Sequence, residues 1–125
     1  MTEEELKSRL KLTALRVIRL VQSLPKNLTA EVIGKQLIRS ATSVSANYYS
    51  ACKARSKADF LHKLGMVEEE ADETQLWIEL IIESGLIKEY RLKDLLREVK
   101  EITAIMASSR ITVKGLRKYD PERIG

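Results

Sequence analysis

The sequence contains very few of the residues from which catalytic and metal sites are usually built. Its 125 residues include one cysteine, Cys52, and one histidine, His62. A lone cysteine excludes a disulfide within the chain and favours a reduced, cytoplasmic setting. Neither residue belongs to a metal-binding motif, and no nucleophile elbow or glycine-rich phosphate loop is present. We therefore expect a protein that is not an enzyme and that holds no metal or other cofactor.

Residues that interrupt helices, and residues that favour sheets, are also scarce. The chain has two prolines and five glycines, and aromatic residues make up 5% of it. Long helices need stretches without proline, whereas strands are enriched in aromatic and β-branched residues. No alternating pattern is long enough to indicate a sheet. These features predict an all-α fold.

Long apolar runs are absent as well. No stretch of about 18 uninterrupted apolar residues exists, so no segment is expected to cross a membrane. The first residues include Glu3, Glu4 and Glu5, whereas a secretory signal would begin with basic residues followed by an apolar run. We expect no membrane association.

Apolar residues recur at helical spacing in four segments, residues 3–24, 29–54, 57–84 and 90–115. Four amphipathic segments of similar length with short joints predict an antiparallel, up-down-up-down four-helix bundle over residues 1–115. Three helices with a split fourth remain the competing architecture. Residues 116–125 are expected to form a basic C-terminal tail.

Local signals mark the predicted joints. Pro25 ends the first segment, and Thr29 is a candidate N-cap of the second. Ser56 and Asp59 have the spacing of a capping box at the start of the third segment. Gly85 is well placed just beyond the end of that segment, where helices often terminate in a left-handed residue.

Charge is distributed unevenly around a net value of +4. Residues 57–85 carry two lysines and eight acidic residues, a net charge of −6. Residues 1–28, 29–56 and 86–125 each carry a net positive charge. This charge pattern has three interpretations. The acidic third helix orders the packing of its basic neighbours, or basic surface from the first and fourth helices collects on one side and binds phosphates, or the acidic edge of one subunit meets the basic edge of the next.

A polar stripe follows the second predicted helix beside its apolar stripe. Such side chains need partners if they face another helix, because an unpaired buried polar group costs about 1–3 kcal/mol. We expect Arg39 to pair across the bundle with Glu69 or Glu73, which share a face of the third helix. The predicted structural polar network comprises Gln36, Arg39, Ser43, Asn47, Glu69 and Glu73.

Three segments together resemble a known family. Residues 36–47 (QLIRSATSVSAN) are similar to the second-helix signature of the bacterial four-helix bundle proteins encoded within intervening sequences of large-subunit ribosomal RNA genes. Residues 54–60 and 69–77 resemble the third-helix signature of the same proteins. The resemblance implies a left-handed bundle that assembles as a ring-like homopentamer. It also implies a distant similarity to the accessory protein of diversity-generating retroelements, which binds nucleic acid and a reverse transcriptase.

Basic residues near the second joint and near the C-terminus are the candidate contacts for a polyanion. We expect a non-enzymatic homo-oligomeric module that contacts RNA or DNA phosphates, with affinity that falls steeply with salt. The alternative is a structural or protein-interaction scaffold that binds its own copies or another protein. The nucleic-acid-binding residues predicted on this basis are Lys53, Arg55, Lys57, Arg110, Lys114, Arg117 and Lys118.

Overall fold

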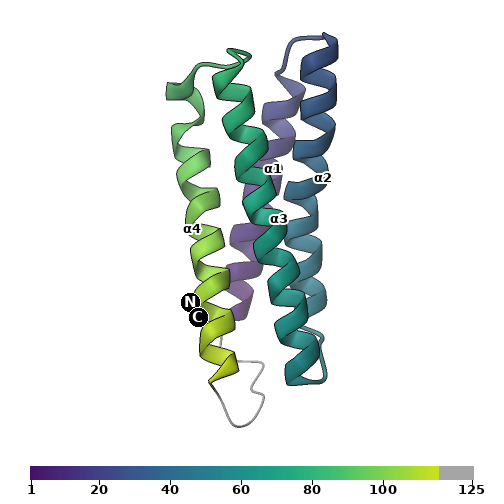
Figure 1. Cartoon of the computed structure of the whole chain (residues 1–125), viewed down its shortest axis with the longest axis vertical. Helices are drawn as coiled ribbons and strands as arrows, with labels where there is room; N and C mark the ends of the chain where they lie inside the picture. The colour runs from purple at the N-terminus through teal and green to yellow at the C-terminus, as the bar shows by residue number, and fades with distance from the viewer. Residues whose placement is uncertain (116–125) are drawn as a thin grey trace.

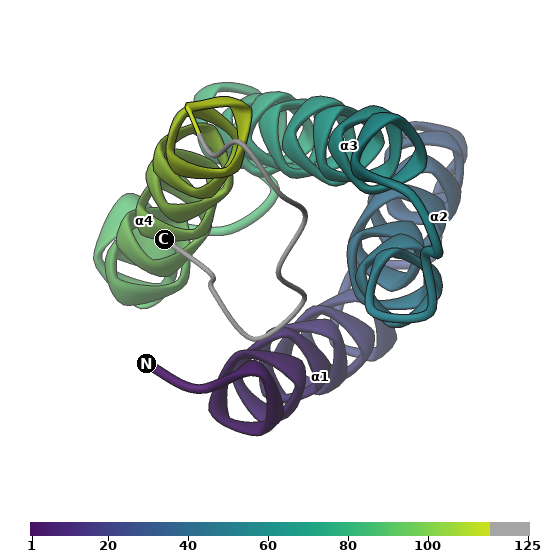
Figure 2. The ribbon, with the colours of Figure 1, turned by 90° about the horizontal axis from the view of Figure 1, so that it is seen from below.

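The computed structural model describes residues 1–115, which form four helices: α1 (Glu3–Gln22), α2 (Leu28–Ala51), α3 (Lys57–Glu83) and α4 (Glu89–Lys114). Successive helices run side by side in opposite directions and are joined by short connections (Figure 1). Viewed end-on, they occupy the corners of a bundle in chain order (Figure 2). The predicted all-α four-helix bundle is confirmed. No helix among residues 1–115 is split, and the predicted tail lies outside the described residues.

Side-chain caps explain where three of the helices begin. Thr2 Oγ1 accepts a hydrogen bond from Glu5 N at 3.1 Å, and Ser56 Oγ accepts one from Asp59 N at 3.1 Å, the role that its spacing predicts. The predicted cap of α2 was wrong: Asn27, not Thr29, caps this helix, and its Oδ1 accepts from Ala30 N at 2.8 Å. Asn27 has extended backbone angles, so the cap lies two residues before Thr29 and the helix begins at Leu28.

The end of α3 is a Schellman turn. Gly85 has a φ of 80°, a left-handed conformation that glycine adopts without steric cost. Its N–H donates to Ile82 O at 3.0 Å, and Leu86 N donates to Ile81 O at 3.1 Å. These two bonds satisfy carbonyls at the end of α3 and reverse the chain into α4.

The core has two apolar halves. One lies toward the end of the bundle where α1 begins, and its largest fully buried side chains include Tyr48, Phe60, Leu64 and Met106. The other lies toward the opposite end and is built from aliphatic residues of all four helices, including Val17, Leu37, Ile78, Ile81, Leu92 and Val99. None of the helices within residues 1–115 has a stretch apolar enough to cross a bilayer.

A polar contact links α2 to α3 inside the bundle. The hydroxyl of Thr74 lies 2.9 Å from that of Ser40, and both residues are buried. Ser40 Oγ donates to Leu37 O at 3.2 Å, and Thr74 Oγ1 also lies 2.8 Å from Glu70 O. Small neighbours, Ala41 on α2 and Ala71 on α3, accompany the pair and let the two helices approach closely.

The helices are not equally well packed against one another. The α2–α3 and α3–α4 pairs have the most extensive contacts, α1 and α2 have fewer, and α1 and α4 contact each other least. Figure 2 shows the corresponding separation of the α1 and α4 ribbons. The bundle is therefore closed along three sides and held more loosely along the fourth.

The buried hydroxyl pair makes a testable contribution to stability. Thr74→Val should lower the free energy of unfolding by about 1 kcal/mol, because it leaves Ser40 without its partner on α3. Thr103→Val is the control, since among residues 1–115 Thr103 Oγ1 bonds within its own helix, to Val99 O at 3.1 Å. Urea denaturation of both variants checks the prediction. Equal losses would show that the link between α2 and α3 contributes nothing.

Candidate nucleic-acid interface

The joint between α2 and α3 presents basic side chains at one end of the bundle. Two consecutive turns end α2, with Lys53 N donating to Ser50 O at 3.1 Å and Ala54 N donating to Ala51 O at 3.0 Å. Ala54 is buried, whereas Lys53 and Arg55 on either side of it are exposed. The buried alanine thus anchors the joint and leaves its two charged neighbours in solvent.

A hydrogen bond brings this joint to the end of α4. Lys57 Nζ donates to the backbone oxygen of Lys114 at 3.2 Å. A cation is favourable at this position, because the last carbonyls of a helix carry partial negative charge. Figure 1 shows the same end of the bundle, where α2 and α4 finish and α3 begins. The structure therefore places together four residues that the sequence predicts as contacts, Lys53, Arg55, Lys57 and Lys114.

Arg110 differs from the other candidate contacts because it is neutralised within the chain. Its Nη2 and Nε lie 2.7 Å and 3.0 Å from Glu68 Oε2 on α3. The carboxylate competes with any phosphate for this guanidinium, so Arg110 is a weaker candidate than its position in the sequence indicates. The remaining candidates, Arg117 and Lys118, lie outside the described residues.

The predicted polar network is centred on Arg39 of α2. Its guanidinium contacts two carboxylates of α3: Nη1 lies 3.1 Å from Glu70 Oε2, and Nη2 forms an ion pair with Glu73. Arg39 Nε also donates to Gln36 Oε1 at 3.3 Å. Trp77, one turn beyond Glu73, donates from Nε1 to the same carboxylate at 3.1 Å. The cluster thus ties the surface of α2 to that of α3.

Three members of the predicted network lie apart from this cluster. Glu69 does not contact Arg39; Glu70 takes that place, because one residue along a helix rotates the side chain by about 100°. Glu69 instead lines a cavity on the α3–α4 side, with Glu68 and Arg110. Ser43 and Asn47 are half-buried on α2 and add no hydrogen bond to the cluster within residues 1–115.

The charged groups of this cluster shift one another's pKa values. The hydrogen bond from Arg39 holds the pKa of Glu73 below its ordinary value, and the bond from Trp77 acts in the same direction. The carboxylate of Glu73 conversely raises the pKa of Arg39. Both effects favour the ionised pair at neutral pH.

Cys52 is a poor nucleophile in this setting. The residue is half-buried at the C-cap of α2, one turn after the fully buried Tyr48. Burial raises the pKa of its thiol to about 12. The reactive thiolate is therefore almost absent at neutral pH.

A second basic region lies on α1 and α4, the two helices on which one interpretation of the charge pattern places basic surface; its individual residues were not named as contacts. Arg9 on α1 makes a two-pronged contact with Glu98 on α4, in which Nε and Nη2 each lie 2.7 Å from a carboxylate oxygen. Glu101 adds an ion pair at 3.1 Å, and these carboxylates raise the pKa of Arg9. Further along the same line of contact between α1 and α4, here called the α1–α4 seam, Arg16 and Arg91 line an open cavity. Predicting this region would require the register of α1 against α4, whose paired residues Arg9 and Glu98 are 89 positions apart in the sequence.

A protein-family model described as 23S rRNA-intervening sequence protein matches residues 5–108. The chain belongs to this family. The resemblance of residues 36–47, 54–60 and 69–77 is thereby confirmed. This membership fixes the fold, and it leaves the molecular activity to be inferred from the chain's own surface.

A solved structure agrees with the family assignment. It is a protein of unknown function from the S23 ribosomal protein family of Bacteroides thetaiotaomicron, with 31% sequence identity and a TM-score of 0.80. The match covers 90% of this chain and 97% of that one, so the two bundles correspond along almost their whole length. No curated protein sequence matches the chain significantly.

The Arg39 cluster predicts a specific pH dependence. Because the pKa of Glu73 is lowered on folding, its contribution is present above the ordinary carboxyl pKa of 4.5 and is lost as the pH falls through the lower folded value. Arg39→Met should therefore lower the thermal midpoint at pH 7, and the difference from the natural protein should shrink well below pH 4.5.

Lys35→Met is the control, because in the described part of the chain Lys35 pairs with Glu31 of its own helix at 3.2 Å, and both side chains are largely exposed. Circular dichroism melts across the pH range provide the measurement. A constant difference between Arg39→Met and the natural protein at every pH would contradict the assigned pairing.

Proposed function

We propose that the protein is a non-enzymatic homo-oligomeric module that contacts the phosphates of RNA or DNA. The observation that supports this most directly is the hydrogen bond from Lys57 to the end of α4, because it joins the basic α2–α3 joint to Lys114. Lys53, Arg55 and Lys114 are exposed, and no carboxylate within residues 1–115 forms an ion pair with them. Such a group of cations can neutralise several phosphates at once.

The basic end of the bundle is better suited to contact phosphates than to recognise particular bases. Phosphate contacts set affinity and position, whereas base readout needs side chains that reach base edges or stack on bases. The described basic end consists of flexible lysine and arginine side chains around a helical joint. We expect binding that depends on charge and tolerates many sequences.

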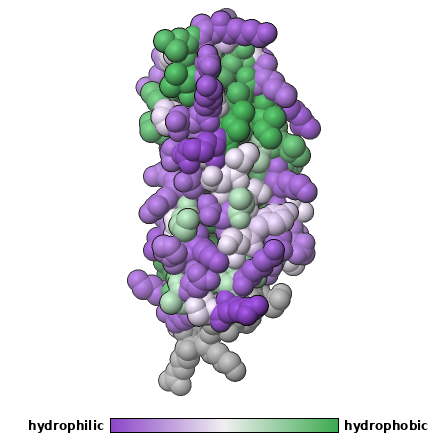
Figure 3. Space-filling model, turned by 90° about the vertical axis from the view of Figure 1, so that its right-hand side faces the viewer, coloured by the Kyte–Doolittle hydropathy of each residue, from purple (hydrophilic) through white to green (hydrophobic). Residues whose placement is uncertain are grey.

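Self-association is the second part of the proposal. A cavity of about 630 Å³ between the end of α1 and the start of α2 is lined by apolar side chains that include Val21, Leu24 and Leu28. Leu28 is 76% exposed and Val32 is 52% exposed. The space-filling view shows hydrophobic surface gathered in the half of this face that contains the cavity (Figure 3). Apolar surface of this kind favours contact with another protein surface.

A ring of five copies is the assembly that we propose, following the family resemblance. Repeating the basic end around one face of a ring would multiply its charge and strengthen its attraction for a polyanion. If the protein were only an interaction scaffold, it would form the same assembly and ignore nucleic acid. Binding and assembly must therefore be measured separately.

Nucleic-acid binding gives the first prediction of this proposal. The double variant Lys53→Gln, Arg55→Gln should bind a single-stranded RNA more weakly, and its plot of log affinity against log salt should flatten by about 0.7 for each lost phosphate contact. Fluorescence anisotropy across a salt series provides the measurement. The double variant Lys11→Gln, Lys100→Gln is the control, because it makes the same change in net charge at exposed lysines of α1 and α4. Natural protein that fails to bind RNA or DNA at low salt would leave only the scaffold.

Assembly gives the second prediction. Light scattering on the natural protein should give about five times the 14.2 kDa mass of one chain. Leu28→Glu should reduce that mass by placing a charge on the apolar face, while leaving the monomer fold intact because Leu28 is exposed. Ile111→Glu is the matched control: it is 71% exposed but lies on α4 at the other end. A monomeric natural protein would refute the assembly.

A further inference from the structure

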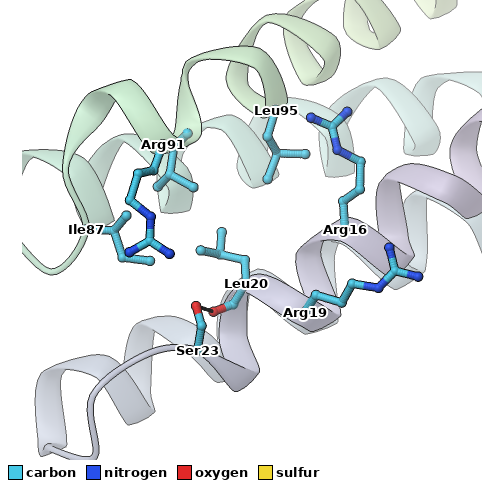
Figure 4. A pocket seen from close by; sticks show the side chains of 8 residues that line it. Arg16, Arg19, Leu20, Ser23, Ile87, Arg91 and Leu95 are labelled. Atoms are coloured by element: carbon cyan, nitrogen blue, oxygen red, sulfur yellow. Dashed lines mark hydrogen bonds between the residues drawn. The ribbon is translucent and has the colours of Figure 1, made fainter.

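A cavity open to solvent lies between the second half of α1 and the first turns of α4. It has a volume of about 340 Å³, and its apolar walls include Leu20, Leu92 and Leu95. Arg16 of α1 and Arg91 of α4 line opposite sides of it, with Leu20 and Leu95 between them, and the side chain of Arg19 points away from Arg91 (Figure 4). Arginines from two facing helices thus line one partly apolar space.

The register of α1 and α4 explains why these arginines meet. Arg9 and Glu98 pair across the same seam, with both contacts at 2.7 Å. Seven residues, or about two helical turns, separate Arg9 from Arg16 on α1 and Glu98 from Arg91 on α4. Because the helices are antiparallel, Arg16 and Arg91 occupy the next equivalent level. The carboxylate that neutralises Arg9 is therefore replaced by a second arginine.

The part of the α1–α4 seam that contains Arg16 and Arg91 has no carboxylate paired with these arginines among residues 1–115. Among residues 1–115, no carboxylate forms an ion pair with Arg16, Arg19 or Arg91. Ser23, which also lines the cavity, directs its hydroxyl to Leu20 O at 2.7 Å. Arginines on both walls give the cavity a positive potential that no ion-paired carboxylate among residues 1–115 offsets. A bound anion would balance that charge.

We propose that the cavity binds a phosphate group between Arg16 and Arg91. Guanidinium groups form two-pronged hydrogen bonds with phosphate oxygens, and a phosphate offers enough oxygens to engage two of them. A phosphate monoester also carries about −1.5 to −2 charge at neutral pH, which matches two cations, whereas one carboxylate supplies a single charge. The leucine wall suits the organic part of a phosphate ester.

This site is separate from the basic end formed by Lys53, Arg55 and Lys114. The cavity is lined by residues near the end of α1 and the start of α4, which lie at the opposite end of the bundle (Figure 1). The phosphate site does not depend on the proposed nucleic-acid contact, and either can fail without the other.

The test is thermal unfolding of the full chain in sodium phosphate and in sodium chloride at equal ionic strength. Phosphate should raise the melting temperature of the natural protein more than chloride does, because a ligand that binds the folded state stabilises it. Arg91→Glu should abolish this difference. It should also raise the melting temperature in chloride, since it gives Arg16 a carboxylate partner like the one that Arg9 has in Glu98.

Arg97→Glu is the matched control for charge. Arg97 lies on the same helix, its side chain is largely exposed, and its ion pair is with Asp94 of its own helix at 3.5 Å. This variant should keep the phosphate effect, and the conservative Arg91→Lys should keep part of it. No advantage of phosphate over chloride in the natural protein, or equal loss in Arg97→Glu, would overturn the site.

A second arm identifies the source of the phosphate. Titration with a single-stranded oligonucleotide at fixed salt compares Arg91→Glu with Arg97→Glu, which carry the same change in net charge. At least roughly ten-fold weaker binding by Arg91→Glu alone assigns the site to backbone phosphates, since the variant loses a charged hydrogen bond to one of them. Equal oligonucleotide binding by the two variants, together with loss of the phosphate effect in Arg91→Glu, assigns it to free phosphate or a small phosphate ester.

Discussion

The buried contact between α2 and α3 is the constraint on which the rest of the bundle depends. Ser40 and Thr74 are both buried and bond to each other at 2.9 Å, with small alanines beside them. A shift of one helix by a turn would separate the hydroxyls and set small residues against large ones. Because such a shift loses a buried hydrogen bond and disturbs the packing, the register of the two helices is well defined.

That register also determines the surface around it. Arg39 directly precedes Ser40 on α2. On α3, Glu70 directly precedes Ala71 and Glu73 directly precedes Thr74. Once the hydroxyls are paired, the guanidinium has carboxylates within reach, and Trp77 bonds to one of them. The exposed cluster is thus a consequence of the core contact, and its own contribution is reduced by solvent.

The sequence predicted helices well because periodicity is a property of each segment alone. The four helices and the Ser56 cap could be read from local patterns. The partner of Arg39 depends on how α3 is rotated about its axis, and a single residue distinguishes Glu69 from Glu70. The pairing of Arg110 with Glu68, and the meeting of Arg16 with Arg91, require the registers of helices that are distant in sequence. No local pattern contains that information.

The acidic α3 explains which arginines of its two neighbouring helices are neutralised within the chain. Its carboxylates pair with Arg39 on α2 and with Arg110 on α4, so they neutralise cations on both neighbours along the middle of the bundle. α1 lies diagonally across from α3 and relies instead on Glu98 and Glu101 of α4 for Arg9. Beyond the reach of these carboxylates, cations remain at the α2–α3 joint and in the cavity between α1 and α4. Internal pairing and the proposed anion-binding surface are therefore two results of one charge distribution.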